Sequence, residues 1–387
     1  MLIKRLKFMK KLLENEKIII AILFLIWKAL LLAVSAVSVQ ILELRGRDFF
    51  GGGYETYITM PFFYGWANFD GEHYLSIANI GYKGLEQAFF PLYPILMNFF
   101  ANPFGHNIFN LVLSGLLISN FCFLIALIIL YKLILLDYSK KIAYLTIISI
   151  LVFPTSFYFG ALYNESLFLL LTVTSFYLMR KNRLFWASIL GFLSSTSRIF
   201  GILLTGAFSI EVWKNKFKLS FLSIFLIPLG LALYMYYQWI TVGDPLAFYH
   251  LQKIVGPQHE SGITLLPQVY FRYIKIILTT QITNPIYITM VLEVVIGLLF
   301  FILPIIGFFK KMRKSYIFYA LVGFLLPTIQ GSFSSVPRYV IVFFPSFIVL
   351  AILLSKFRII TRVSMLIFSA IWLIINTALF FRGYWVA

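Results

Sequence analysis

Residues 17–39, KIIIAILFLIWKALLLAVSAVSV, decide the class of fold, since after Lys17 they carry only one charge, at Lys28. A helix that spans a bilayer needs about 20 consecutive apolar residues. This run exceeds the core of a cleavable signal peptide, which is about 7–15 residues long, and no small-x-small cleavage motif directly follows it. The sequence therefore predicts a retained first membrane helix.

Similar apolar runs recur along the whole chain and predict an all-α polytopic membrane protein with about 11 spans. They lie at 18–42, 108–131, 142–161, 164–179, 184–211, 219–240, 287–309, 315–330, 338–354 and 363–381. The proline-broken segment 89–104 leaves two topologies open. Either this segment spans, or it is re-entrant and 184–211 forms two short helices that meet near Arg198. Both place the N-terminus inside and the C-terminus outside.

Composition agrees with one membrane domain over residues 1–387. The chain is 61% hydrophobic and only 12% charged, whereas soluble domains are about 45–50% apolar and about 25% charged. The net charge of +18 comes largely from Lys and Arg in the predicted N-terminus, residues 1–17, and in short later gaps. Cytoplasmic loops retain such residues, so the charge indicates membrane topology and not nucleic-acid binding. The lone Cys122 permits no intrachain disulfide.

Two long polar loops, residues 43–88 and 241–286, lie outside the cytoplasm in both topologies. The first holds six of the 14 acidic residues in the protein. Acidic residues contribute little to topology, so we expect this enrichment to serve a function. With four widely spaced histidines, a metal site is not expected.

The stretch WANFDGEHYLSIANIGY, residues 66–82, predicts an amphipathic helix at the outer membrane interface, with apolar residues every three to four positions. Such a helix holds Asp70 and His73 one turn apart. A carboxylate fixed there can take a proton from an acceptor hydroxyl. Glu72 and Tyr74 are further candidates on the same helix. The alternative is an interfacial anchor with solvated acids.

Charged residues inside apolar runs need a partner or a function, because a central arginine costs about 2.5–3.5 kcal/mol to insert. Arg198 and Arg338 are candidates for binding a lipid phosphate; the alternatives are an internal ion pair and snorkelling to the interface. Glu165 either lines a cavity or is a loop acid. Glu293 is a functional candidate without an assigned role. Three further positions complete the set: Lys28 pairs internally or faces a cavity, Asp244 caps a helix, and Lys83 is an ordinary loop residue.

Five segments in this order resemble the PIG-V-type mannosyltransferases, which are GT-C glycosyltransferases that use a polyprenyl-phosphate sugar. They are FDGEHYLSIANIGY (69–82), AFFPLYPIL (88–96), YNESLFLLLTVTSFYLMRKNRLFWASILGFLSSTSRIFGILL (163–204), GDPLAFYH (243–250) and SSVPRYVIVFFPSFIVLA (334–351). The resemblance implies that Asp70 is the catalytic base, with Phe69 where tryptophan is common. It also implies that Arg198, followed shortly by glycine, and Arg338 bind the donor phosphate. Glu72 and His73 stand where the family varies.

The resemblance implies a membrane enzyme that transfers a hexose to a hydroxyl acceptor on the extracytoplasmic face. That the hexose is mannose is implied by the resemblance alone. The displacement would invert the sugar, and the lipid-linked sugar is a substrate, so no cofactor or metal is expected. The expected partners are the donor lipid, a glycolipid, glycan or protein acceptor, and the bilayer. Two other classes stay open: a transporter or flippase that uses Lys28, Arg198 and Glu293, and a non-catalytic subunit.

Overall fold

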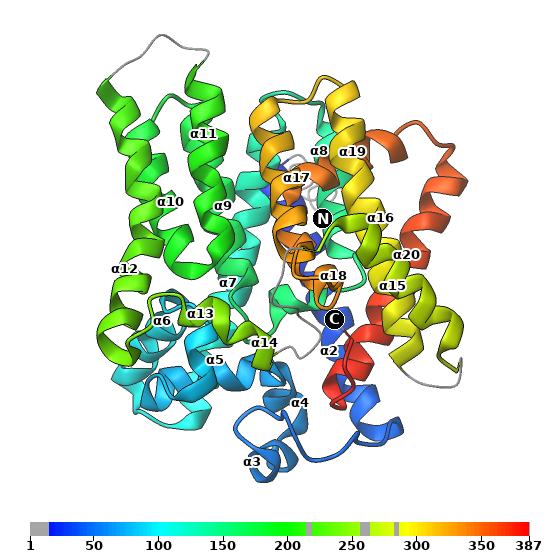
Figure 1. The fold of residues 1–387 in the computed structure, drawn as a ribbon. Coiled ribbons are helices and arrows are strands. Elements are labelled where there is room, and N and C mark those ends of the chain that lie inside the picture. The colour runs from blue at the N-terminus through cyan, green and yellow to red at the C-terminus, as the bar shows by residue number, and fades with distance from the viewer. Residues whose placement is uncertain (1–14, 214–218, 256–263, 282–285, 387) are drawn as a thin grey trace, which may run out of the picture.

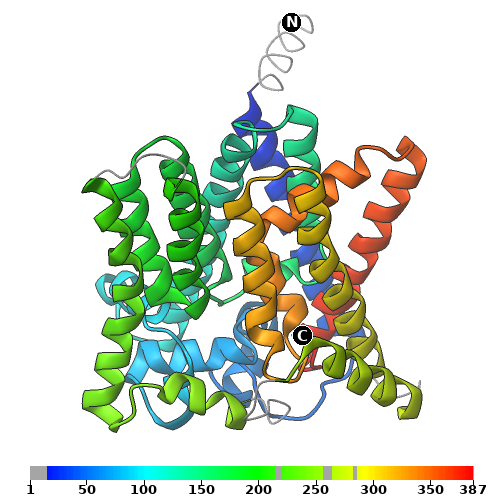
Figure 2. The ribbon, with the colours of Figure 1, turned by 45° about the horizontal axis from the view of Figure 1, so that its top comes forward.

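The computed structural model describes residues 15–213, 219–255, 264–281 and 286–386, and every regular element among them is a helix. The basic residues before Asn15 and part of the predicted second outer loop, including His259, lie outside these ranges. The longest helices run side by side through the molecule (Figures 1 and 2). They are α2 (Glu16–Ile41), α7 (Ile108–Ile134), α12 (Leu226–Val242), α16 (Ile286–Phe309) and α20 (Ile359–Phe381).

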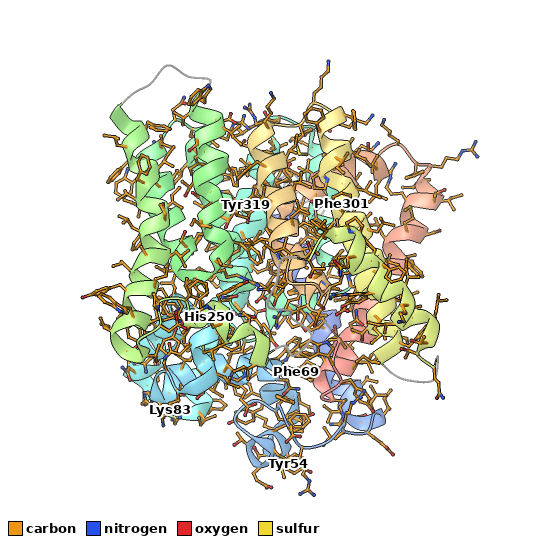
Figure 3. All side chains as sticks on the ribbon, in the orientation of Figure 1. Tyr54, Phe69, Lys83, His250, Phe301 and Tyr319 are labelled. Carbon is orange, nitrogen blue, oxygen red and sulfur yellow. The ribbon has the colours of Figure 1, made fainter. Side chains whose placement is uncertain are left out.

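Short helices gather at one end of this bundle, below the long helices in Figure 1, and we call this the loop end. They are α3 (Tyr54–Thr59), α4 (Pro61–Tyr64), α5 (Asp70–Ile80), α6 (Leu92–Ala101), α13 (Ala247–His250) and α14 (Gln252–Val255). Among the side chains labelled in Figure 3, Tyr54, Phe69 and Lys83 lie at this end. The two predicted outer loops therefore share one end of the molecule.

Five helices among the described residues are long and apolar enough to cross a membrane, or six if one bent pair forms a single span. The bent pair joins residues Val336–Val342 to Phe344–Leu354 at an angle of 86°. The predicted count of about 11 spans is thus not confirmed, because several predicted spans form shorter helices. These are α8 (Lys140–Leu151), α9 (Glu165–Arg180), α10 (Leu184–Ser197), α11 (Leu203–Trp213), α17 (Lys314–Thr328) and α19 (Phe344–Leu354).

The chain breaks at Arg198, as the second of the two predicted topologies requires. Helix α10 ends at Ser197, Arg198 is extended with φ −155° and ψ 152°, and a short 3-10 turn leads into α11. Helix α6 has 10 residues, which rise only about 15 Å at about 1.5 Å per residue. That is half the thickness of a bilayer core, roughly 30 Å, so α6 alone is too short to cross one.

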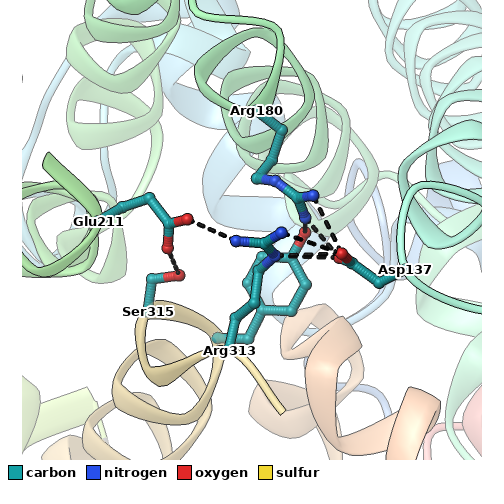
Figure 4. Close-up of polar contacts among 6 residues, drawn as sticks. Asp137, Arg180, Glu211, Arg313 and Ser315 are labelled. Atoms are coloured by element: carbon teal, nitrogen blue, oxygen red, sulfur yellow. Dashed lines mark hydrogen bonds and ion pairs between the residues drawn. The ribbon is translucent and has the colours of Figure 1, made fainter. Parts of the chain in front are cut away.

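At the end opposite the loop end, charged side chains from four parts of the chain form a cluster that we call the clasp (Figure 4). Asp137, just after α7, accepts hydrogen bonds from Arg180 of α9 and from Arg313, at 3.0 Å from Nη2 of each arginine. Glu211 of α11 accepts from Arg313 Nη1 at 2.7 Å and from Ser315 Oγ at 2.9 Å. The clasp therefore ties α7, α9, α11 and α17 together.

Candidate functional site

Asp70 is the first residue of α5, and its direction is set by an unusual backbone at the preceding residue. Phe69 has φ +56°, a conformation that is strained for a bulky residue and is kept only where the surroundings enforce it. Its amide donates to the Phe49 carbonyl at 2.8 Å, and its ring contacts those of Phe49, Phe380 and Trp385. The start of α5 is therefore held firmly in place.

Asn68 connects this turn to distant parts of the chain. Its buried Nδ2 donates to the Phe380 carbonyl at 3.1 Å, at the end of α20. Its own carbonyl accepts from the Tyr163 hydroxyl at 2.9 Å. Since both partners are backbone or buried groups, Asp70 is fixed relative to α20 and to the segment just before α9.

Arg338 meets Asp70 across the site. It lies in the short helix α18 (Val336–Tyr339), and its Nη1 is 2.5 Å from Asp70 Oδ2. The rings of Tyr158, Tyr163 and Tyr339 surround its guanidinium at 5.1–5.7 Å. Aromatic faces attract a cation, so they help to hold Arg338, which is only 6% exposed.

Arg198 joins the same group of charges through Glu165. Arg198 Nη1 lies 2.7 Å from Glu165 Oε1, and the same oxygen lies 3.8 Å from Arg338 Nε. The four side chains Asp70, Arg338, Glu165 and Arg198 thus alternate in charge and sum to zero; we call them the cavity network. Glu165 Oε2 and Arg338 Nε are buried without a hydrogen-bond partner among the described residues. Unpaired buried polar atoms are costly, so the network keeps unused hydrogen-bonding capacity.

Three members of the cavity network line a cavity of about 410 Å³ at the loop end, a volume in the range of small-ligand sites. Its lining residues are of two kinds, polar or amphipathic and apolar. The polar and amphipathic residues are Asp70, Tyr74, Asn164, Arg198, Tyr249, Gln252, Gln330, Ser334, Ser335, Arg338, Tyr339 and Trp385. The apolar residues are Ala88, Phe89, Phe90, Ile199, Phe200, Phe248, Ile286, Leu326, Pro327 and Ile329. This wall suits a ligand with a charged head and a hydrocarbon portion.

The structure brings together most, but not all, of the predicted site residues. Asp70, Arg198, Arg338 and Tyr74 line the cavity, and Glu165 lies buried between the two arginines. The catalytic and phosphate-binding roles of these residues stay predictions. Their convergence shows only that one ligand can reach both arginines and Asp70.

Asp70 and His73 lie one turn apart on α5, as predicted, but Glu72 and His73 are not among the residues that line the cavity beside the face of Asp70. The helical repeat of 3.6 residues places position i+4, Tyr74, closest to that face. His73 instead stacks on Phe89 with ring centroids 4.7 Å apart. Burial raises the pKa of Glu72 above its ordinary value.

The other singled-out charges have local partners. Lys28 donates to the Gly160 carbonyl at 3.2 Å and lies 4.1 Å from the ring centroid of Trp66, so it pairs internally. Asp244 accepts from the Leu246 amide at 2.9 Å and binds His250 at 2.7 Å. The N-cap of α13 is Leu246, without a side-chain cap bond, so Asp244 closes a turn ahead of the helix and is not the predicted cap. Among the residues described, no three His, Cys, Asp or Glu side chains gather as a metal site.

Glu293 lines a second cavity, of about 300 Å³, with Arg272, Tyr273, Thr289 and Ser332 among its neighbours. Trp385 belongs to the walls of both cavities. Sequence reasoning missed Trp385, because a tryptophan just after a membrane helix is also typical of the interfacial aromatic belt. Only the path of the chain after α20 brings it beside Phe69.

Comparisons with known proteins identify a family. Residues 11–249, more than half of the chain, match the family described as mannosyltransferase (PIG-V). No curated protein sequence matches significantly.

Solved structures of the Archaeoglobus fulgidus oligosaccharyltransferase are similar over 92–93% of this chain. The apo form gives a TM-score of 0.45 at 13% identity. The complex with Zn and sulfate gives 0.44 at 13%, and the form tethered to an acceptor peptide containing the NVT sequon gives 0.42 at 14%. The match covers only 53–56% of those chains, so this chain spans about half of their length.

Proposed function

Because the chain belongs to the mannosyltransferase (PIG-V) family, it is a membrane glycosyltransferase, and we propose that it transfers a hexose, specifically mannose, from a polyprenyl-phosphate donor to a hydroxyl acceptor. The observation that carries the proposal is that Asp70, Arg198 and Arg338 line one cavity with an apolar wall. An acid, two guanidiniums and an apolar surface are what a lipid-phosphate sugar and its acceptor require.

In the proposed reaction, Asp70 accepts the proton of the acceptor hydroxyl as its oxygen attacks the anomeric carbon of the donor sugar. The bond between that carbon and the phosphate oxygen breaks, and its electron pair stays on the phosphate. One displacement inverts the anomeric carbon, so a single base suffices, in contrast to the two carboxylates of a retaining glycosidase. The released polyprenyl phosphate needs no nucleotide site.

Arg338 and Arg198 would stabilise the negative charge that develops on the leaving phosphate. Arg338 contacts Asp70 and lies near Glu165 in the structure, yet its Nε has no hydrogen-bond partner among the described groups. A guanidinium has five N–H donors, so Arg338 can bind a phosphate oxygen and still contact Asp70. Such a bridge would place the leaving group beside the base.

The hydrocarbon tail of the donor would lie along the apolar part of the wall, against Phe89, Phe90, Phe248 and Leu326. We place the loop end outside the cytoplasm, since basic residues such as Lys140 and Lys310 lie at the opposite end of the bundle, where the clasp is, and basic loops are retained in the cytoplasm. With the shorter helices counted as spans, the proposed topology keeps 11 crossings. The acceptor would be a glycolipid, a glycan or a protein.

A transporter is less well supported by the geometry. Its proposed path used Lys28, Arg198 and Glu293. In the structure Arg198 and Glu293 line different cavities, and Lys28 is bound to the Gly160 carbonyl, outside both walls. These three charges do not form one pathway.

The test uses the purified protein in nanodiscs with a short-chain polyprenyl-phosphate mannose and a panel of mannose-terminated acceptors. We expect release of polyprenyl phosphate together with a mannosylated product of opposite anomeric configuration. Asp70→Asn should abolish most turnover, whereas Glu72→Gln, on the same helix but away from the cavity wall, should not. Full turnover by Asp70→Asn would refute the assignment of the base. Movement of intact donor across vesicles without cleavage would favour the transporter.

A further inference from the structure

The segment that leads into α18 ends in an unusual conformation. Ser335 has φ +62° and ψ 3°, the left-handed region that glycine adopts freely and that costs other residues roughly 1–2 kcal/mol. It is also buried, at 5% exposure. A serine stays in this conformation only when neighbouring groups hold it there.

Two buried side chains from other helices hold the backbone of this segment. Tyr273 of α15 (Leu266–Thr279) donates its hydroxyl proton to Glu293 Oε2 of α16 at 2.8 Å, and the same hydroxyl accepts from the Phe333 amide at 3.1 Å. Glu293 and Tyr273 are 3% and 5% exposed, so water does not readily replace these bonds.

Ser332 completes the arrangement. Its Oγ lies 3.1 Å from the Tyr273 hydroxyl and accepts from the Ser334 amide at 2.9 Å. The amides of Phe333 and Ser334, which directly precede Ser335, are therefore each bound by a side chain of one cluster. This accounts for the buried acid Glu293, which needs a partner inside an apolar helix.

The conformation of Ser335 determines where Arg338 lies. The Ser335 carbonyl accepts hydrogen bonds from the amides of Arg338, at 3.0 Å, and Tyr339, at 2.9 Å. Any rotation about the Ser335 backbone therefore turns the short helix that carries the guanidinium. An error of about 1 Å in the position of a catalytic group can cost on the order of 100-fold in rate.

We propose that Glu293 and Tyr273 are positioning residues. Glu293 fixes the Tyr273 hydroxyl, which holds the backbone at Phe333; this keeps Ser335 in the left-handed conformation and thereby orients Arg338 toward Asp70 and the donor phosphate. The effect on turnover rests on the proposed transferase function. The effect on the backbone does not, because it depends only on hydrogen bonds within the protein.

The chain provides a matched control one turn away on α15. Tyr270 packs against the Phe333 ring at 4.7 Å, as Tyr273 does at 5.1 Å, but its buried hydroxyl has no hydrogen-bond partner among the described residues. Tyr273→Phe and Tyr270→Phe each remove one buried hydroxyl from the same surroundings. Only the first removes the bonds that hold the segment.

Amide hydrogen exchange of the full-length protein, followed by mass spectrometry, tests the backbone effect. We expect Tyr273→Phe to speed exchange over residues 333–339, with Tyr270→Phe unchanged from wild type. Equal exchange in both variants would overturn the proposal. This result stands whether or not the protein is a transferase.

Kinetics test the consequence for Arg338. Tyr273→Phe should lower kcat/KM for the donor by about 10- to 100-fold, whereas Tyr270→Phe should lower it less than twofold. Adding Ser335→Gly should restore part of the loss, because glycine adopts the left-handed conformation without strain. Faster exchange with unchanged kcat/KM in Tyr273→Phe would overturn the link to Arg338. An inactive wild type would instead refute the proposed function.

Discussion

The cavity network and the clasp contain the same side chains, one aspartate, one glutamate and two arginines, at opposite ends of the bundle. In the clasp, Asp137 is bound by both Arg180 and Arg313, and Glu211 by Arg313 and Ser315. In the cavity network, Glu165 Oε2 and Arg338 Nε lack hydrogen-bond partners among the described residues.

Their surroundings differ as well. Three members of the cavity network line the 410 Å³ cavity, whereas no clasp residue lines either cavity described above. Glu165 is 2% exposed at its side chain, but Arg313 is 34% exposed. The comparison teaches that composition does not separate a structural ion-pair cluster from a candidate active site. Unused hydrogen-bonding capacity beside a cavity does.

Substituting one aspartate in each cluster tests whether the two clusters differ in function. Asp70→Asn keeps the shape of the side chain but not its basicity, and we expect a loss of roughly 10²–10⁴-fold in turnover. Asp137→Asn should retain activity at a temperature where it stays folded. Donor cleavage measured on both purified variants checks this, and equal losses would remove the functional distinction between the clusters.

A second experiment measures what the ion pair of Asp70 and Arg338 contributes to stability and to activity. Arg338→Gln leaves Asp70 and Glu165 facing only Arg198, and breaking a buried ion pair destabilises by about 3–5 kcal/mol. The double variant Asp70→Asn with Arg338→Gln should recover part of that stability, because both members of the pair become neutral. It should remain inactive. Thermal unfolding and donor cleavage are the two measurements, and recovery of activity in the double variant would contradict the assigned roles.

The clasp should affect stability more than rate. Asp137→Asn removes the carboxylate that joins Arg180 and Arg313, and a hydrogen bond to a charged group contributes about 1.5–3 kcal/mol. Since the clasp is partly exposed, we expect the lower part of that range and a dependence on salt. The midpoint of thermal unfolding at two salt concentrations measures this. An unchanged midpoint would mean that the clasp contributes nothing to stability.

The two ends should also respond differently to acid. Burial raises the pKa of Asp137, but hydrogen bonds from Arg180 and Arg313 outweigh it and leave that pKa below its ordinary value. A carboxyl with a lowered folded pKa contributes stability above its unfolded pKa, about 3.9, and loses it as pH falls through the folded pKa. Unfolding midpoints between about pH 5 and pH 3 should therefore fall less steeply in Asp137→Asn than in wild type.

The smallest expected effect concerns Glu72. Burial raises its pKa, so the folded state holds the proton more tightly and stability declines as pH rises from the unfolded pKa through the folded one. Glu72→Gln removes the charge and should raise the unfolding midpoint slightly at neutral pH, with no change at acid pH. A lower midpoint at neutral pH would show that the ionised carboxylate is needed.

The sequence predicts the class of fold from its long apolar runs, and it selects site candidates from the few charged residues within or beside those runs. Long apolar runs predict membrane helices, and one of the two topologies that the sequence left open contains the break at Arg198 that the structure shows. The predicted residues Asp70, Arg198 and Arg338 meet although Asp70 and Arg338 are 268 positions apart. Family resemblance contributed to that choice, because hydrophobic periodicity alone does not relate distant segments.

What the sequence did not predict depends on backbone conformation and long-range packing. The left-handed Phe69 and Ser335 are not glycines, so no local signal marks them. That Tyr74 and not His73 lines the cavity with Asp70 depends on how α5 packs against distant segments. The role of Glu293 depends on Tyr273 and, through it, on the Phe333 amide, which come from separate parts of the chain.

The separation of Asp70 from Arg338 has a consequence for how the protein is made. At about 5–20 residues per second, roughly 13–54 s pass on the ribosome between the two residues, which are 268 positions apart. Trp385 and the carbonyls of Phe380 and Phe381 that hold the Asp70 turn emerge later still. During this time a nascent chain has Asp70 without Arg338, and the turn before Asp70 without its hydrogen bonds to Phe380 and Phe381. The paired, supported form of the site therefore arises only after the segment from Arg338 to Phe381 has been synthesised.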